Sequence, residues 1–204
     1  MKTRIKICGI KHLKDAMAAI DAGADALGFV FYHKSPRFIS LDDARNIIEK
    51  LPPFITTVGL CVNADEETIK QIIDTGIDIM QFHGDELANY CDGFNFPYIR
   101  AVRVSTTDDI YAAEKNFNKA KALLLDAYDP KVYGGTGKSF NWELIPNDLT
   151  KPVILAGGLN ADNVTEAISE VKPFAVDVSG GVESQTGIKS KEKIRAFCQA
   201  VALV

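Results

Sequence analysis

The chain has 204 residues and a mass of 22.3 kDa, which suits one large domain better than two small ones. Its composition, 47% hydrophobic and 25% charged, excludes disordered, collagen-like and disulfide-stapled classes. The formal net charge of -4, without a long basic run, argues against a nucleic-acid partner. We therefore expect one domain over residues 1–204 with a buried core.

The N-terminus and the cysteines bear on location. Residues 1–8 contain no apolar signal-peptide core, and no stretch approaches the roughly 18 apolar residues of a membrane span. The cysteines, Cys8, Cys61, Cys91 and Cys198, are scattered and form no Cys-x-x-Cys pair. The sequence thus predicts a cytoplasmic protein with reduced thiols, no membrane contact, and neither a zinc site nor a redox motif.

Short β-type runs alternate with helical patterns along the whole chain, as in a series of βα units. The predicted strands cover residues 4–8, 26–31, 56–62, 79–83, 98–102, 122–126, 153–156 and 175–178. Helical spacing of apolar residues marks the segments between them.

Local signals place several helices in these segments. Residues 13–22 carry the apolar spacing of a helix, and Gly23 supplies its C-terminal stop. Ser40 is the predicted N-cap of the next helix. Asn160 and Ser190 are predicted to open helices over residues 161–170 and 191–201.

An internal sequence similarity supports a repeated βα architecture, because residues 21–29 resemble residues 74–82 at an offset of 53 residues. Eight βα units in one chain predict a TIM barrel, a closed (β/α)8 fold of the α/β class. The alternative is an open doubly wound sheet, but no Gly-x-Gly-x-x-Gly follows the first strand.

A TIM barrel carries its active site at the C-terminal ends of its strands. Cys8 ends the first predicted strand and Asp126 ends the sixth. Strand alternation puts Cys8 on the face of Lys6, and Asp126 on the face of Leu124, so both can project into the barrel mouth. The alternative remains that Cys8 is a packed core thiol and that Asp126 caps a loop.

Glycine-rich loops follow the last two predicted strands. Gly157 and Gly158 come after the seventh, and Ser179, Gly180 and Gly181 come after the eighth. Backbone N–H groups in such loops, with the helix N-termini behind them, can bind phosphate. Ordinary turns are the alternative reading.

The longest predicted loop, residues 127–140, resembles half of a Walker A motif. Val132 stands where that motif needs its first glycine, so we set the motif aside. A lid around Gly135, Thr136 and Gly137 that closes on substrate fits such a loop, as does a disordered surface loop.

Two further residues lie near the predicted mouth. Pro36 stiffens the loop after the second strand and can direct Arg37 inward, where a guanidinium suits a carboxylate ligand; a solvated surface arginine is the alternative. His83 ends the fourth strand and is either an acid or base or a structural histidine.

Motifs along essentially the whole chain resemble the phosphoribosylanthranilate isomerases, TIM-barrel enzymes of tryptophan biosynthesis. The motifs are Lys6-Ile-Cys8-Gly9, Gly28-Phe-Val-Phe31, Ser35-Pro-Arg37, Gln81-Phe-His-Gly84, Leu124-Leu-Asp126, Gly134-Gly-Thr-Gly137, Leu155-Ala-Gly-Gly-Leu159 and Val176-Asp-Val-Ser-Gly-Gly-Val-Glu183. The resemblance implies an aldose–ketose isomerase that needs no cofactor and converts N-(5-phosphoribosyl)anthranilate to a 1-deoxyribulose by an Amadori rearrangement.

The same resemblance implies roles for individual residues. Cys8 falls on the general base, Asp126 on the general acid and Arg37 on the arginine that faces the anthranilate carboxylate. The phosphate falls on the two glycine loops, Gly157 and Gly158 and residues 179–181, and we also count His83 and Asp177 as substrate-binding. Lys6 or a helix N-terminus is expected to help the Cys8 thiol act as a base.

The sequence departs from the family pattern at two positions, and two alternative functions remain open. The family usually has a serine at Gly180 and commonly an aromatic residue at Cys61. The related histidine-pathway isomerase uses aspartates at the ends of strands one and five, where this chain has Cys8 and Val102. A phosphate-binding barrel without catalysis is a second rival, and a monomer or a homodimer is expected.

Overall fold

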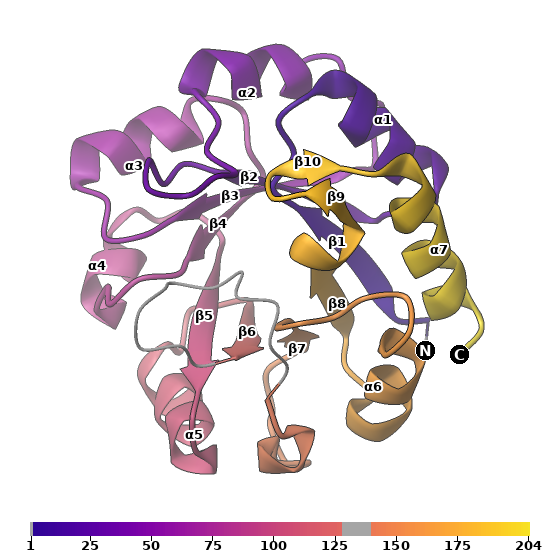
Figure 1. The fold of residues 1–204 in the computed structure, drawn as a ribbon. Helices are drawn as coiled ribbons and strands as arrows, with labels where there is room; N and C mark the ends of the chain where they lie inside the picture. The colour runs from indigo at the N-terminus through magenta and orange to yellow at the C-terminus, as the bar shows by residue number, and fades with distance from the viewer. Residues whose placement is uncertain (1, 128–139) are drawn as a thin grey trace.

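The strands of the chain form a closed barrel. A computed structural model describes residues 2–127 and 140–204. Eight parallel strands pair in chain order, and β1 pairs with β8 to close the sheet (Figure 1). They are β1 Arg4–Cys8, β2 Ala26–Val30, β3 Thr56–Cys61, β4 Ile79–Phe82, β5 Tyr98–Val104, β6 Ala122–Ala127, β7 Val153–Leu155 and β8 Ala175–Val178. The prediction of a TIM barrel is therefore confirmed.

Helices surround the barrel, and a small hairpin lies over its mouth (Figure 1). The α-helices are α1 Leu13–Asp21, α2 Leu41–Ile48, α3 Glu66–Ile73, α4 Ala88–Gly93, α5 Thr107–Asn116, α6 Val164–Val171 and α7 Lys191–Ala202. Single 3-10 turns are η1 Trp142–Leu144 and η2 Gly180–Val182, and the hairpin strands are β9 Glu183–Gln185 and β10 Ile188–Lys189. No helix among the described residues is long and apolar enough to cross a membrane.

Predicted caps form at two of the three expected helix starts. The side chains of Ser40 and Ser190 accept hydrogen bonds from the backbone N–H groups of Asp43 and Lys193. The third prediction is wrong by three residues, since α6 begins at Val164. Asn160 accepts from the N–H groups at 162 and 163 and so closes a turn ahead of the helix.

The sixth βα unit also departs from the pattern. Between β6 and β7 the described residues contain η1 but no α-helix. The η1 segment packs Trp142, Ile145 and Phe140 against the core, so apolar side chains of the described residues cover part of the barrel there.

The barrel interior has an apolar layer below a polar one. The apolar side chains are small or branched, and they are Val58, Ile99, Ala101, Ala122, Leu124, Ile154, Ala156 and Ala175. Above them, alternation along β1 and β6 puts Cys8 and Asp126 at the pocket in the mouth, as predicted, whereas Lys6 is buried beside Asp177 and does not line the pocket. This arrangement fills the barrel and leaves chemistry to the strand ends.

A buried carboxylate fastens the loops that follow β3 and β4. Glu86 accepts hydrogen bonds from the backbone N–H groups of Asn63 at 2.7 Å and Gly84 at 2.9 Å. It also pairs with Arg100 of β5, whose Nη1 lies 2.9 Å from Oε2. Because the Glu86 side chain is 2% exposed, water cannot replace it as a partner for these groups.

We therefore predict that Glu86→Ala lowers the free energy of unfolding by about 3 kcal/mol, as expected when one partner of a buried ion pair is removed. Urea denaturation measures the change. Lys70→Ala is the control, since Lys70 forms an exposed pair with Glu66 on α3, and it should cost about 0.5 kcal/mol or less. Equal losses in the two variants would contradict the assigned role of Glu86.

Candidate active site

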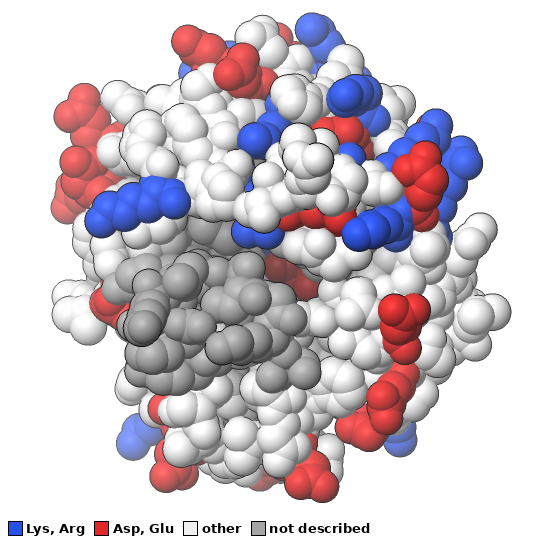
Figure 2. Space-filling model, in the orientation of Figure 1, with Lys and Arg blue, Asp and Glu red and all other residues white. Residues whose placement is uncertain are grey.

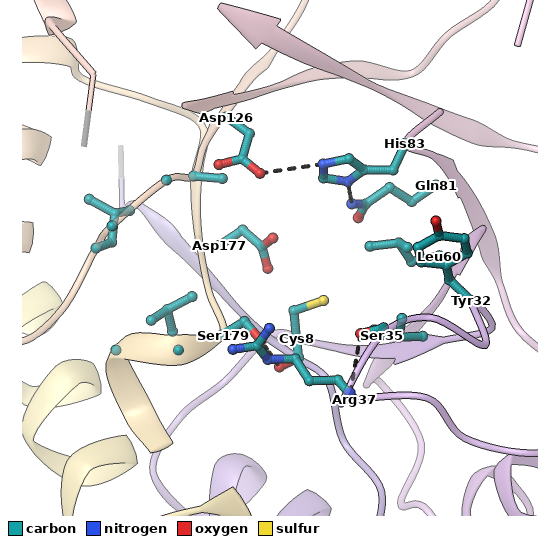
Figure 3. Close-up of a pocket in the computed structure, with 18 of the residues that line it drawn as sticks. Cys8, Tyr32, Ser35, Arg37, Leu60, Gln81, His83, Asp126, Asp177 and Ser179 are labelled. Carbon is teal, nitrogen blue, oxygen red and sulfur yellow. Dashed lines mark hydrogen bonds and ion pairs between the residues drawn. The ribbon is translucent and has the colours of Figure 1, made fainter. Parts of the chain in front are cut away.

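A pocket of ≈ 320 Å³ opens at the C-terminal ends of the strands (Figure 3). Every described residue that we predicted for the site lines it: Cys8, Arg37, His83, Asp126, Gly157, Gly158, Asp177, Ser179, Gly180 and Gly181. The predicted lid residues Gly135, Thr136 and Gly137 lie outside the described residues. Barrel closure thus gathers loops from both halves of the chain around one cavity.

The Cys8 thiol lies beside a buried ion pair. Lys6 Nζ donates to Asp177 Oδ1 at 2.9 Å, across the seam where β1 and β8 pair in register. A Cβ atom on Gly28 of β2 would lie 2.8 Å from Cys8 Sγ and 3.1 Å from Lys6 Nζ. The missing side chain at Gly28 therefore leaves room for the thiol and the ammonium group.

The surroundings of Cys8 oppose its ionisation. Burial raises the pKa of the Cys8 thiol, the Lys6 charge lowers it, and the Asp177 charge raises it again. The pKa of Cys8 ends above its ordinary value, so Lys6 gives less help than we expected. Burial alone would lower the pKa of Lys6, yet Asp177 and Cys8 raise it overall, so this residue stays an ammonium.

Asp126 and His83 lie next to each other in the wall of the pocket (Figure 3). Its Oδ2 lies 3.3 Å from His83 Nε2, within ion-pair range but without hydrogen-bond alignment. Asp126 Oδ1 accepts from the backbone N–H of Ala127 at 2.8 Å, which fixes the carboxylate at the strand end. Gln81 Nε2 lies 3.0 Å from His83 Nδ1 and holds the other side of the ring.

Two buried atoms in this wall have no hydrogen-bond partner among the described residues, Gln81 Oε1 and His83 Nε2. Unsatisfied buried polar atoms are costly, and a ligand in the pocket would relieve that cost. We did not single out Gln81 as a functional residue, although strand alternation puts it on the same face as His83.

The two glycine loops pack closely against each other at the pocket. Gly157 and Gly158 have φ of 83° and 66°, a region that L side chains rarely adopt. A Cβ atom on Gly181 would collide with the carbonyl oxygen of Leu159, so Gly181 lets the loops after β7 and β8 pack together. Gly180 has space for a side chain, although a Cβ atom there would lie 3.4 Å from Arg37 Nη2.

The helix N-termini that we predicted behind these loops are only partly present. After β8 the chain forms the single turn η2 and then the hairpin, and α7 starts only at Lys191. After β7 the turn at Asn160 precedes α6. Backbone N–H groups of the loops and of η2 therefore replace full helix N-termini at this end of the pocket.

Arg37 lines the pocket, but it also has a protein partner that the sequence analysis did not predict. Its Nε and Nη2 donate to Glu183 at 2.8 and 2.9 Å, which is a bidentate pair. As expected for a stiffened loop, the Ser35 hydroxyl accepts from the Arg37 backbone N–H. Glu183 follows the motif Ser179-Gly-Gly-Val, and no local signal links it to Arg37.

Charge on the outer surface is uneven on the face that Figure 2 shows. Lys and Arg side chains gather around α7 and the hairpin, and α7 carries Lys191, Lys193 and Arg195. This basic margin lies on the side of the barrel that carries the β8 loop. It favours the approach of an anionic ligand despite the net charge of -4.

Known proteins are similar to this chain along nearly its whole length. Residues 5–200 match the family described as N-(5'phosphoribosyl)anthranilate (PRA) isomerase. The N-(5'-phosphoribosyl)anthranilate isomerase of Pseudomonas syringae pv. tomato is 56% identical over 199 residues, which are 97% of each chain.

Solved structures agree in fold. A crystal structure of phosphoribosyl anthranilate isomerase from Thermotoga maritima matches with a TM-score of 0.91 and 42% identity, over 99% of this chain and 100% of that one. A phosphoribosyl anthranilate isomerase in complex with reduced 1-(o-carboxyphenylamino)-1-deoxyribulose 5-phosphate matches with a TM-score of 0.87 and 40% identity, over 99% and 100%. The family match and the 56% identity together show that the chain belongs to the phosphoribosylanthranilate isomerase family.

Proposed function

We propose that Cys8 and Asp126 are the general base and general acid with which this chain isomerises N-(5'-phosphoribosyl)anthranilate. Family membership gives the reaction itself, an aldose–ketose isomerisation in tryptophan biosynthesis. The observation that carries the assignment is that a thiol from β1 and a carboxylate from β6 line one pocket (Figure 3). A barrel that merely bound phosphate would not need this convergence.

The proposed reaction moves protons between the substrate and these side chains. Asp126 donates a proton to the ring oxygen, and the C1–O bond breaks to give the open Schiff base. The Cys8 thiolate then removes the proton from C2, and its electron pair forms the C1–C2 double bond of an enolamine. Tautomerisation to the ketone places a proton on C1 and leaves an isomer of the substrate, so no cofactor is consumed. His83 lies beside Asp126, where its ring can return a proton to the Asp126 carboxylate after each turnover.

The ends of the substrate differ in chemistry, and so do the ends of the pocket. We assign the phosphate to the backbone N–H groups around Gly157, Gly158 and residues 179–181, because the glycines leave these amides approachable. Arg37 receives the anthranilate carboxylate through its guanidinium group. Asp177 has Oδ1 on Lys6, which leaves Oδ2 for a substrate hydroxyl.

The remaining proposals follow from the same assignment. Gly135, Thr136 and Gly137 form a lid over the pocket, which is a hypothesis for residues outside the described part. Residues 1–204 form one cytoplasmic domain that acts as a monomer or a homodimer, and the four unpaired, buried cysteines fit a reducing compartment. The histidine-pathway substrate is disfavoured because β5, Tyr-Ile-Arg-Ala-Val-Arg-Val, contains no carboxylate.

The acid role predicts that Asp126→Asn lowers kcat by about 10²- to 10⁴-fold, the usual range for general acid catalysis. The amide keeps the shape of the side chain but cannot donate the carboxyl proton. Steady-state assays with freshly made phosphoribosylanthranilate measure kcat, and titration with a product analogue checks that binding persists. A kcat close to that of the wild type would rule out Asp126 as the acid.

The base role predicts that Cys8→Ser abolishes turnover while phosphate binding and folding persist. A serine hydroxyl ionises only at extreme pH, so at working pH it supplies almost none of the ionised form that would accept the proton. Since the pKa of Cys8 is raised, the thiolate accumulates at alkaline pH, and wild-type kcat/KM should rise as pH increases toward that range. Cys198→Ser, in α7, is the control and should keep most of the activity. Wild-type turnover in Cys8→Ser would end the assignment.

The two anion sites predict opposite binding defects. Arg37→Ala should weaken a carboxylated product analogue and leave inorganic phosphate affinity nearly intact. Gly181→Ala should weaken phosphate, because the new methyl group pushes the loop after β8 away from Leu159. Isothermal titration with each ligand separates the cases, and equal loss of phosphate affinity in both variants would show that the ends are assigned wrongly.

A further inference from the structure

The carboxylate of Glu183 is the centre of a buried cluster outside the residues assigned to chemistry. It accepts hydrogen bonds from Arg37 Nε at 2.8 Å and Nη2 at 2.9 Å, from Lys189 Nζ at 2.8 Å and from the Gly187 backbone N–H at 3.0 Å. Burial by itself would raise the pKa of Glu183, but the hydrogen bonds from Arg37 and Lys189 hold that pKa at about 2. Glu183 is therefore an ionised acceptor with every lone-pair direction in use.

The pair orients one edge of the Arg37 guanidinium and leaves the other edge available. Nε and Nη2 face Glu183, while Nη1 has no hydrogen bond to a described residue. Arg37 lines the pocket, and Gly9 makes room for its stem, since a Cβ atom there would lie 2.8 Å from Arg37 Cδ. Figure 3 shows the guanidinium beside Cys8 and Ser179.

Lys189 ties this cluster to the loop after β8. Its Nζ donates to the Ser179 carbonyl at 3.0 Å and lies 3.3 Å from the Ser179 hydroxyl, which in turn donates to the Cys8 carbonyl at 3.0 Å. Gly187 of the hairpin turn packs against the loop that carries Arg37, since a Cβ atom there would lie 2.6 Å from the Pro36 carbonyl oxygen. The β9–β10 hairpin thus joins the loops after β2 and β8.

The charges of the cluster do not cancel. Arg37 and Lys189 contribute two positive charges against one negative charge on Glu183, so one positive charge remains for an incoming anion. An arginine without Glu183 would have the same charge but a free choice of rotamers, and binding would have to order it. Preorganisation by the bidentate pair removes that cost.

We infer that Glu183 is a positioning residue, which acts through Arg37 to hold the guanidinium ready for the carboxylate of the substrate. This inference rests on the proposed role of Arg37. It assigns to the hairpin β9–β10 a function in recognition of the aromatic acid, beyond its contacts with the fold.

The test compares phosphoribosylanthranilate with phosphoribosylaniline, which lacks the carboxylate. Glu183→Gln should raise KM for phosphoribosylanthranilate by about 10- to 100-fold, the range for a lost charge-assisted hydrogen bond, with a smaller change in kcat. KM for phosphoribosylaniline should stay within about twofold of the wild-type value. In an Arg37→Ala background, Glu183→Gln should add nothing, because Glu183 acts through that guanidinium.

Control variants separate positioning from a general structural role. Glu170→Gln removes an exposed charge from α6 and should change neither KM. Glu183→Asp keeps the charge, but its side chain is too short to reach both Nε and Nη2 of Arg37. It should therefore also raise KM for phosphoribosylanthranilate selectively, by a smaller factor than Glu183→Gln. Circular dichroism establishes which variants fold.

The outcomes are distinct. If the wild type turns over neither compound, the proposed function fails. If the wild type and Arg37→Ala behave as expected but folded Glu183 variants keep the wild-type ratio of the two KM values, the inference is overturned. Equal rises in both KM values, or loss of folding in both Glu183→Gln and Glu183→Asp, would assign Glu183 to structure alone.

Discussion

Closure of the parallel sheet is the constraint on which the rest of the molecule depends. Because β1 pairs with β8, all the strands end at one rim, and residues as distant as Cys8 and Gly181 line one pocket. The closing register sets Lys6 beside Asp177, where the two charges lie 2.9 Å apart and buried. Each charge alone would have a large desolvation cost in the barrel. The pairing of β1 with β8 therefore also balances the two buried charges beside the pocket.

The interior of the barrel has an apolar layer that supports the fold and a polar layer that lines the pocket. Its lower layer is apolar and well filled, while its upper layer holds an ion pair, a thiol, a histidine and a carboxylate. The upper layer is not fully satisfied, because Gln81 Oε1 and His83 Nε2 lack partners among the described residues. Burial also raises the pKa of the Cys8 thiol. Such local costs are typical of a site shaped for a ligand.

The two ends of the pocket differ in the chemical groups that line them. At one end, Gly157 and Gly181 let backbone segments approach closely and present amide groups. At the other, Arg37 presents charge and is held by a carboxylate that two cations keep ionised. Lys189 of the hairpin donates hydrogen bonds both to Glu183 and to the Ser179 carbonyl, so the hairpin is bonded to residues at both ends.

The sequence was enough to predict the barrel, its strands, and the places of Cys8 and Asp126 at or next to strand ends, because alternation, glycine stops and βα order are local properties. It also determined the caps Ser40 and Ser190. The three-dimensional fold decided where α6 begins, what covers the barrel in the described residues between β6 and β7, and which group holds Arg37, since Glu183 is 146 residues away. It likewise decided the raised pKa of Cys8, because desolvation depends on every element packed around the thiol rather than on its neighbours in the chain.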